Sequence, residues 1–349
     1  MSFKQNELLK QLLSSPTTFQ ASEAGQLMGQ IMQGQLSPAQ VGSFLTALKL
    51  SGLDHRPSHI AAIAKGMRAA VGGAVLSEEG RTSPVVDIVG TGGDGQDTFN
   101  VSTASAIVVA GAGVKVAKHG NRSSSSQCGS ADVLEALGAK LENITAERVP
   151  RILENGNFCF LFAQVFHTSM RYVAGPRKEL GVKTVFNTLG PLTNPAMPDR
   201  MIVGVFSKAI GHIIAEALQL SGVKRAWVVH GGIGLDEIAP IGDTFVWSLE
   251  NDTITEFTIH PRDFGLQEHP LESVRGGDAA YNSGTMSQLL GGELPDGHPV
   301  LDFVLLNSGA LLHVSGKAAS LKEGVELARN SVRSGGARSE LEKYVASSK

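Results

Sequence analysis

From about residue 84 onwards, short apolar runs alternate with segments of helical periodicity, and this alternation restricts the fold more than any other feature. The apolar runs are 85–89, 114–117, 158–163, 201–206 and 226–229. The helical patterns between them are 103–110, 131–137, 146–155 and 213–220. Buried strands that alternate with helices predict a parallel sheet with right-handed crossovers. Two further segments, 244–249 and 253–259, flank Asn251-Asp252 and predict an antiparallel hairpin added to that sheet.

The first 75 residues differ in their pattern of apolar residues, because this pattern has helical spacing throughout and predicts no strand. One helix start is marked by Ser37-Pro38-Ala39-Gln40, which supplies an N-cap, a proline in the first turn and a capping-box glutamine. We therefore predict the α/β class, with a small N-terminal all-helical domain over residues 1–75 and a large α/β domain over residues 76–349 around a mostly parallel sheet. Four short helices form a thin layer, which we expect to pack on another surface such as a second copy of the chain.

Charge and cysteine content exclude several classes of protein. Thirty Lys and Arg against 33 Asp and Glu give a formal net charge of −3, which argues against a dedicated nucleic-acid binder. Cys128 and Cys159 are too few for a disulfide scaffold and lack the spacing of zinc ligands. No apolar stretch reaches the ~18 residues that a membrane span needs. These features predict a cytoplasmic protein with no membrane partner.

A glycine-rich loop follows the first predicted strand. Residues 90–95 read GTGGDG and match the dinucleotide fingerprint G-x-G-x-x-G. That fingerprint also requires an acidic residue about 20 positions later, but residues 98–131 contain no Asp or Glu. The dinucleotide interpretation therefore fails. A glycine turn still lets backbone N–H groups approach a phosphate, and the alternative is a tight turn without a ligand.

Two hydroxyl-rich segments lie at the same expected edge of the sheet. Ser102 and Thr103 begin a helix, where they are either ordinary caps or part of an anion site. After the second strand, residues 118–126 read KHGNRSSSS and join two cations to four serines. Residues 98–131, which contain no Asp or Glu, hold Lys115, Lys118 and Arg122 and so carry local positive charge. Such charge favours a phosphate or pyrophosphate ligand.

Two further features have competing interpretations. Asp236 and Glu237 follow a later strand, where adjacent carboxylates suit Mg²⁺ bound together with substrate phosphates, or form an exposed acidic turn. Arg177 lies in the cation-rich segment 171–195, where it either clamps a carboxylate or remains a surface charge. Spacing alone does not choose between these alternatives.

Four motifs, in order and correctly spaced, resemble those of the anthranilate phosphoribosyltransferase family. They are GTGGDGQDTFNVST at 90–103, KHGNRSSSS…GSADVLEALG at 118–138, GPRKELGVKTVFNTLGPLTNP at 175–195 and VHGGIGLDE at 229–237. The resemblance implies a helical domain next to the α/β domain, with the helical segment near 175–200 joining the helical domain. It also implies a homodimer formed by the helical domains. It implies transfer of the phosphoribosyl group of 5-phosphoribosyl 1-diphosphate to the amine of anthranilate, with release of pyrophosphate, in tryptophan biosynthesis.

The resemblance also implies which residues serve the site. The residues matching the donor site are Gly90, Gly93, Asp94, Thr98, Asn100, Val101, Ser102, Thr103, Lys118, His119, Gly120, Asn121, Arg122, Ser123, Ser124, Ser125, Ser126 and Ser130. Those matching Mg²⁺ ligands are Ser102, Asp236 and Glu237, and those matching anthranilate contacts are Gly90, Asn121, His167 and Arg177.

The chain departs from the family pattern on the expected acceptor path. Gln164 and Thr168 stand where the family commonly has prolines, whereas His167 is retained. No nucleophile–base pair is apparent, which fits a reaction that depends on stabilising the leaving group and positioning an uncharged aromatic amine. Two alternatives remain, namely a pyrimidine nucleoside phosphorylase of the same architecture and a catalytically silent relative that binds nucleic acid.

Overall fold

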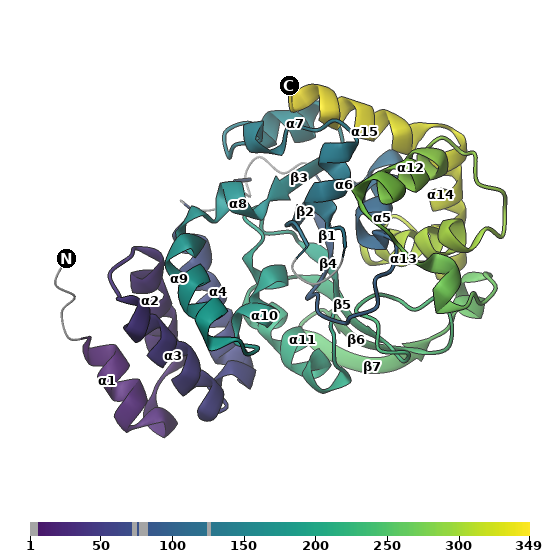
Figure 1. The fold of residues 1–349 in the computed structure, drawn as a ribbon. Helices are drawn as coiled ribbons and strands as arrows, with labels where there is room; N and C mark the ends of the chain where they lie inside the picture. The colour runs from purple at the N-terminus through teal and green to yellow at the C-terminus, as the bar shows by residue number, and fades with distance from the viewer. Residues whose placement is uncertain (1–5, 72–74, 77–82, 124–126) are drawn as a thin grey trace.

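The computed structural model describes residues 6–71, 75–76, 83–123 and 127–349, so the predicted ligands Ser124, Ser125 and Ser126 lie outside the described residues. A seven-stranded sheet in the order β3-β2-β1-β4-β5-β6-β7 forms its centre (Figure 1). The strands are β1 (Val85–Gly90), β2 (Lys115–Gly120), β3 (Phe158–Phe162), β4 (Arg200–Gly204), β5 (Arg225–Gly231), β6 (Thr244–Glu250) and β7 (Thr253–Ile259).

The predicted parallel sheet and its appended hairpin are confirmed. Strands β1 to β5 pair in parallel, whereas β6 pairs antiparallel with both β5 and β7. Asn251 and Asp252 join β6 to β7 with φ angles of 50° and 58°. Positive φ at both positions matches the right-handed twist of the two strands, which explains why this dipeptide forms the hairpin turn.

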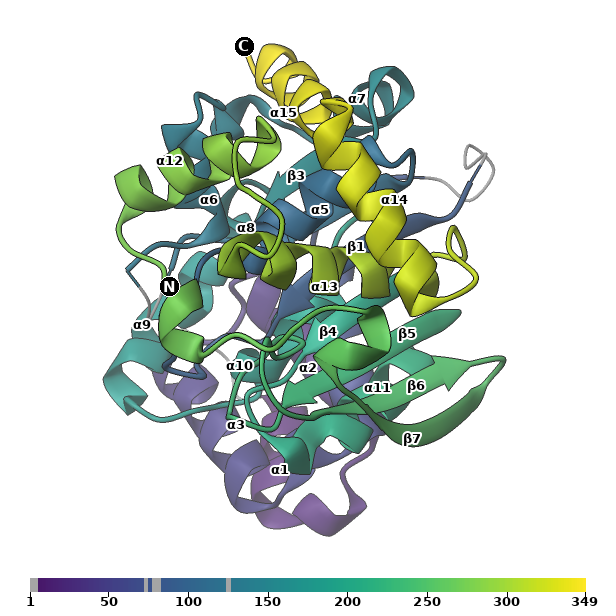
Figure 2. The ribbon, with the colours of Figure 1, turned by 90° about the vertical axis from the view of Figure 1, so that its right-hand side faces the viewer.

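Helices cover both faces of the sheet. The α-helices of the α/β part are α5 (Val101–Gly111), α6 (Ser130–Ala136), α7 (Val149–Asn155), α8 (Ala163–Phe166), α10 (Phe186–Leu189), α11 (Gly211–Leu220), α12 (Ala279–Leu290), α13 (Pro299–Val314), α14 (Leu321–Arg333) and α15 (Gly336–Ser347). Helix α13 is buried along almost its whole length because α5 and α14 pack against it and the sheet lies beneath it (Figure 2). Among the described helices, none is both long and apolar enough to span a bilayer.

The N-terminal helices form a separate layer beside the sheet (Figure 1). They are α1 (Glu7–Ser14), α2 (Ala21–Met32), α3 (Pro38–Leu50) and α4 (Pro57–Ala69), and α9 (Arg171–Leu180) packs against α3 although it is distant in sequence. The predicted capping box is present, because the Ser37 hydroxyl accepts from the Gln40 N–H at 3.3 Å and the Gln40 side chain accepts from the Ser37 N–H at 2.9 Å.

This layer finds its packing partner within the same chain. Its apolar side chains belong to one cluster with α11 and with sheet residues such as Val203 and Val228. Burial against the sheet therefore stabilises helices that are individually short. The cluster brings α4 and α9 next to the carboxyl ends of the strands.

Helices α2 and α4 approach closely because glycines face each other. A Cβ added at Gly66 would lie 2.4 Å from the Gly25 carbonyl oxygen, whereas a Cβ at Gly29 would meet no atom within 4 Å. We expect Gly66→Ala to destabilise the protein by about 1–3 kcal/mol, because the helices must move apart. Gly29→Ala is the matched control and should stabilise it by up to about 1 kcal/mol, because alanine favours helix. Melting temperatures measure both effects, and equal shifts would contradict the close approach.

Candidate active site

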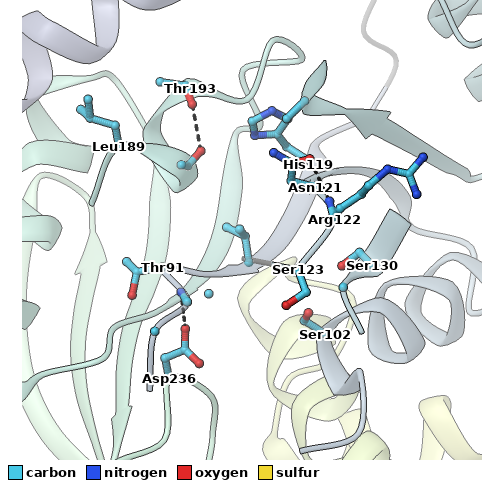
Figure 3. Close-up of a pocket in the computed structure, with 18 of the residues that line it drawn as sticks. Thr91, Ser102, His119, Asn121, Arg122, Ser123, Ser130, Leu189, Thr193 and Asp236 are labelled. Carbon is cyan, nitrogen blue, oxygen red and sulfur yellow. Dashed lines mark hydrogen bonds between the residues drawn. The ribbon is translucent and has the colours of Figure 1, made fainter. Parts of the chain in front are cut away.

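A cavity of about 680 Å³ lies at the carboxyl ends of the parallel strands (Figure 3). The residues predicted from the sequence that line it are Gly90, Gly93, Asp94, Thr98, Asn100, Val101, Ser102, Lys118, His119, Gly120, Asn121, Arg122, Ser123, Ser130, His167, Arg177, Asp236 and Glu237. Thr103 does not line the cavity. It is fully buried, and its hydroxyl donates to the Ser130 hydroxyl at 2.8 Å, so it reaches the cavity only through Ser130.

The glycine turn, residues 90–95 after β1, is hydrogen-bonded to the acidic turn, which follows β5 and contains Asp236 and Glu237. Gly92 and Gly93 have φ angles of 73° and 82°, which side chains rarely permit. The Gly92 N–H donates to Asp236 Oδ2 at 2.6 Å. A Cβ on Gly90 would lie 2.5 Å from the same oxygen, so only glycine allows this approach. The two turns thus form one wall of the cavity.

Asp236 and Glu237 are buried, so the alternative of an exposed acidic turn is wrong. Burial, together with the nearby Asp94 carboxylate, raises the pKa of Asp236 to about 7. Burial and the Asp236 charge raise the pKa of Glu237 well above its usual value, although Lys118 opposes this rise. The site therefore concentrates negative charge that a cation would offset.

The donor set at this turn fits a magnesium ion. Glu237 is hydrogen-bonded to Ser102, which accepts from Lys118 Nζ at 3.2 Å. Within the described residues, no group of three or more His, Cys, Asp or Glu side chains is arranged to hold a metal. Two carboxylates and a hydroxyl leave coordination positions for substrate oxygens and water, as is typical of Mg²⁺ bound with phosphates.

The cations of the 115–122 segment have three different environments. Lys118 is buried beneath the cavity, where its ammonium donates to the Ile88 carbonyl at 2.6 Å. Arg122 lines the cavity, but its Nη2 donates to Glu135 at 2.8 Å, so part of its charge is neutralised. Lys115 points elsewhere and donates to the Gly156 carbonyl at 2.8 Å beyond α7. The expectation that Lys115 adds to the positive site is therefore wrong.

Two neutral histidines lie side by side in the cavity. The rings of His119 and His167 are 5.0 Å apart and edge-to-face. Burial lowers the pKa of His119 to about 3 and that of His167 to about 4. Each ring hydrogen-bonds to the backbone, His119 at Gly190 and His167 at Thr193. The Nε2 atom of each has no hydrogen-bond partner among the residues that the structure describes.

On the side of α4, α9 and α10, the cavity is lined by several apolar side chains and by two arginines, Arg171 and Arg177. The guanidinium of Arg177 lies 5.0 Å from the centre of the Phe186 ring, and burial lowers its pKa. The apolar side chains that line the same cavity are Met67, Met170, Phe186 and Leu189. A flat apolar ring that carries one carboxylate matches this combination.

Several lining residues were not predicted from the sequence. Met67 comes from the helical layer, and no local pattern distinguishes it from the other core residues of α4. Gln164 lines the cavity and its amide donates to Asn121 Oδ1 at 3.5 Å, although the sequence marked it only as a departure from the family. Gly190 and Thr193 belong to the segment 171–195, whose density of Pro and Gly was the available signal.

Comparison with known proteins shows the family of the chain that forms this cavity. The model of the glycosyl transferase family a/b domain matches residues 82–338, and that of its helical bundle domain matches residues 6–71. The chain is 44% identical over 325 residues to the anthranilate phosphoribosyltransferase of Dehalococcoides mccartyi, covering 93% of this chain and 92% of that protein. The chain belongs to the anthranilate phosphoribosyltransferase family.

Solved structures of anthranilate phosphoribosyltransferases superpose on almost the whole chain. The crystal structure of the Thermus thermophilus protein matches with a TM-score of 0.89 and 45% identity, covering 98% of this chain and 99% of that chain. The Saccharomyces cerevisiae protein in complex with phosphoribosyl pyrophosphate and Mg matches with a TM-score of 0.87 and 34% identity, covering 98% and 96%. The family fold extends across both the helical layer and the α/β part.

The acidic turn leads to a prediction with opposite effects on activity and stability. An unfolded Asp ionises near pH 4, but folded Asp236 ionises near about 7. The folded state therefore holds the extra proton, and stability falls as the pH rises between these values. Asp236→Asn combined with Glu237→Gln should lower turnover roughly 100-fold or more, while raising the melting temperature at pH 8. Thermal scans from pH 4 to 8 should also show a weaker pH dependence for the variant.

Retained turnover at low magnesium concentration would reject the role of the acidic turn in activity. A melting temperature that falls in the variant would reject the conclusion that these buried carboxylates repel each other.

Proposed function

We propose that this protein transfers the phosphoribosyl group of 5-phosphoribosyl 1-diphosphate to the amine of anthranilate and releases pyrophosphate, a step of tryptophan biosynthesis. The observation that carries the proposal is the division of one cavity into two chemically distinct halves. The glycine turn, hydroxyls and Lys118 form a half suited to a phosphorylated donor. The apolar half that ends at Arg177 suits an aromatic carboxylate.

The donor half supplies several kinds of phosphate contact. The glycine turn, the start of α5, Ser123 and Ser130 line the same cavity, and backbone N–H groups and hydroxyls are the groups that bind phosphate in such places. The ammonium of Lys118, which is hydrogen-bonded to Ser102, adds positive charge to the donor half of the cavity. We assign Mg²⁺ to Ser102, Asp236 and Glu237, where the bound ion would neutralise charge on the leaving pyrophosphate.

The acceptor half needs no strong base. The aromatic amine is uncharged near neutral pH, so its lone pair is available to attack C1 of the ribose. The lowered pKa values of His119 and His167 keep both rings neutral at that pH. Both Nε2 atoms are buried behind the cavity surface, so we assign neither ring as a base or as a hydrogen-bond partner of the amine. As the amine nitrogen bonds to C1, the bond from C1 to the pyrophosphate oxygen breaks, and the proton that the nitrogen loses leaves with pyrophosphate or passes to water.

The direct test uses the complete chain with anthranilate, phosphoribosyl pyrophosphate and magnesium. Loss of anthranilate fluorescence that depends on both the donor and the metal is the expected result. Consumption of phosphate and a pyrimidine nucleoside without metal, with no loss of anthranilate fluorescence, would instead identify a nucleoside phosphorylase.

We infer further that the protein is a cytoplasmic homodimer with the predicted domain boundary near residue 75. Leu13 of α1 and Leu50 of α3 are 55% and 84% exposed on the helical layer, as expected for side chains that a second copy covers. Cys128 and Cys159 are buried thiols, which fits a reducing compartment.

Arg177→Ala tests the acceptor half. A charge-assisted hydrogen bond is worth ~1.5–3 kcal/mol, so the anthranilate KM should rise roughly 10- to 150-fold. The donor KM should change little, because the donor is held by the opposite half. Lys178→Ala removes an exposed charge of the same helix and is the matched control. Steady-state kinetics with each substrate varied decides, and a raised donor KM with an unchanged anthranilate KM would contradict this division of roles.

Leu50→Glu tests the dimer. A two-fold interface contains each residue twice, and burying a leucine is worth ~1.5–3 kcal/mol. The dimer dissociation constant should therefore rise roughly 100-fold or more. Leu220→Glu, at a 60% exposed leucine of α11, is the control and should leave the dimer intact. Sedimentation velocity measures both, and an undisturbed dimer in Leu50→Glu would exclude this surface.

A further inference from the structure

The central strands β1 and β2 pair over only a short distance. Their register is recorded at Val85 opposite Lys115 and at Val86 opposite Val116. On its other side, β1 pairs with β4 from Val86 to Gly90. The ladder between β1 and β2 therefore ends before the carboxyl ends of the strands, where the cavity lies. Side chains take over the hydrogen bonds that the ladder does not make there.

Three side chains form hydrogen bonds at the end of β1 and β2 where the ladder is missing. They belong to Asp87, Lys118 and Asn194, and we call this group the bridge. Asp87 Oδ2 accepts from the His119 N–H at 3.5 Å and from Asn194 Nδ2 at 2.7 Å. Asn194 Nδ2 also donates to the Ala117 carbonyl at 2.8 Å. In the opposite direction, Lys118 Nζ donates to the Ile88 carbonyl at 2.6 Å. Each strand therefore supplies a charged side chain that bonds to the backbone of the other.

The bridge is buried and its two charges depend on each other. Asp87 is 0% exposed and Lys118 is 1% exposed. Burial raises the pKa of Asp87 to about 6, and the Lys118 charge opposes this rise. The carboxylates of Asp87 and Glu237 are the charges that offset the buried Lys118 ammonium. Removal of one of these carboxylates leaves the ammonium with less compensating charge and weakens the hold on its position.

Asp87 itself does not line the cavity, whereas Lys118 and His119 do. We propose that Asp87 is a positioning residue, which holds the Lys118 ammonium and the backbone at His119 in place beneath the phosphoribosyl donor and thereby sets donor affinity. This inference rests on the proposed function, because it assumes that the donor occupies the half of the cavity above Lys118.

Asp87→Asn isolates the charge from the hydrogen bonds. The amide oxygen can replace Oδ2 as the acceptor for His119 and Asn194. The amide nitrogen then takes the position of Oδ1, which has no hydrogen-bond partner among the described residues. The hydrogen bonds of the bridge survive this change, but one of the two carboxylates that offset the Lys118 charge is lost.

We expect the donor KM and the donor dissociation constant, the latter from calorimetric titration with phosphoribosyl pyrophosphate and Mg²⁺, to rise roughly 10- to 100-fold. The anthranilate KM should stay within about twofold of the native value, because the Arg177 half is untouched. A purely structural role would lower the melting temperature without separating the two KM values.

The chain offers a matched control in Asp302 of α13. Its carboxylate is 4% exposed and bonds to His269 Nε2 at 2.8 Å, away from the cavity. Asp302→Asn also removes a buried charge, so it should lower stability while the donor KM stays unchanged. A rise of donor KM in both variants would show that general loosening, and not the bridge, is responsible.

Asn194→Ala provides a second variant. It leaves the charges of Asp87 and Lys118 in place and removes only the hydrogen bonds of the Asn194 amide to Asp87 and to the Ala117 carbonyl. A smaller rise of donor KM is therefore expected. If Asp87→Asn does not fold, this variant decides. Folded variants with unchanged donor affinity overturn the inference, whereas a native protein without anthranilate-dependent turnover overturns the proposed function instead.

Discussion

The burial of opposite charges at the carboxyl edge of the sheet is the constraint on which the site depends. Asp87, Asp236, Glu237 and Lys118 are all less than 10% exposed, and their carboxylates outnumber the ammonium. Such a group is costly to bury unless each charge has a partner. Lys118 supplies part of that compensation, because its charge opposes the rise in the pKa of Asp87 and of Glu237. The excess negative charge left at Asp236 and Glu237 is what suits the site to a divalent cation.

Close packing at the glycine turn turns this charge arrangement into a fixed geometry. The Asp236 backbone oxygen lies where a Cβ on Gly204 would stand, and its carboxylate lies against Gly90. The acidic turn can approach β1 and β4 only because both strands end in glycine. This arrangement brings carboxylates together in a buried place, where each disfavours the charged form of the other. Carboxyl groups whose pKa values are raised in this way are typical of functional centres.

The helical layer completes the cavity with different chemistry. Met67 of α4 and Arg177 of α9 reach the strand ends only because the layer packs on the sheet through a shared apolar cluster. The half to which we assign the phosphates is therefore built from loops of the sheet, and the half to which we assign the aromatic carboxylate is built largely from helices. The packing of α4 and α9 on the sheet therefore fixes the distance between the two halves of the cavity.

The sequence by itself determined the parts whose signals are local. The apolar runs set the strands, Asn251-Asp252 set the hairpin, and GTGGDG, KHGNR and the acidic pair marked the strand ends that meet at the cavity. Only the tertiary structure decided where each charge points. Lys115 and Lys118 lie three residues apart on one strand, yet one bonds beyond α7 and the other lies beneath the cavity. Asp87 gave no signal, because one acidic residue in an apolar run has no period. Such roles depend on contacts between residues distant in sequence, such as Asp87 with Asn194, which no local pattern encodes.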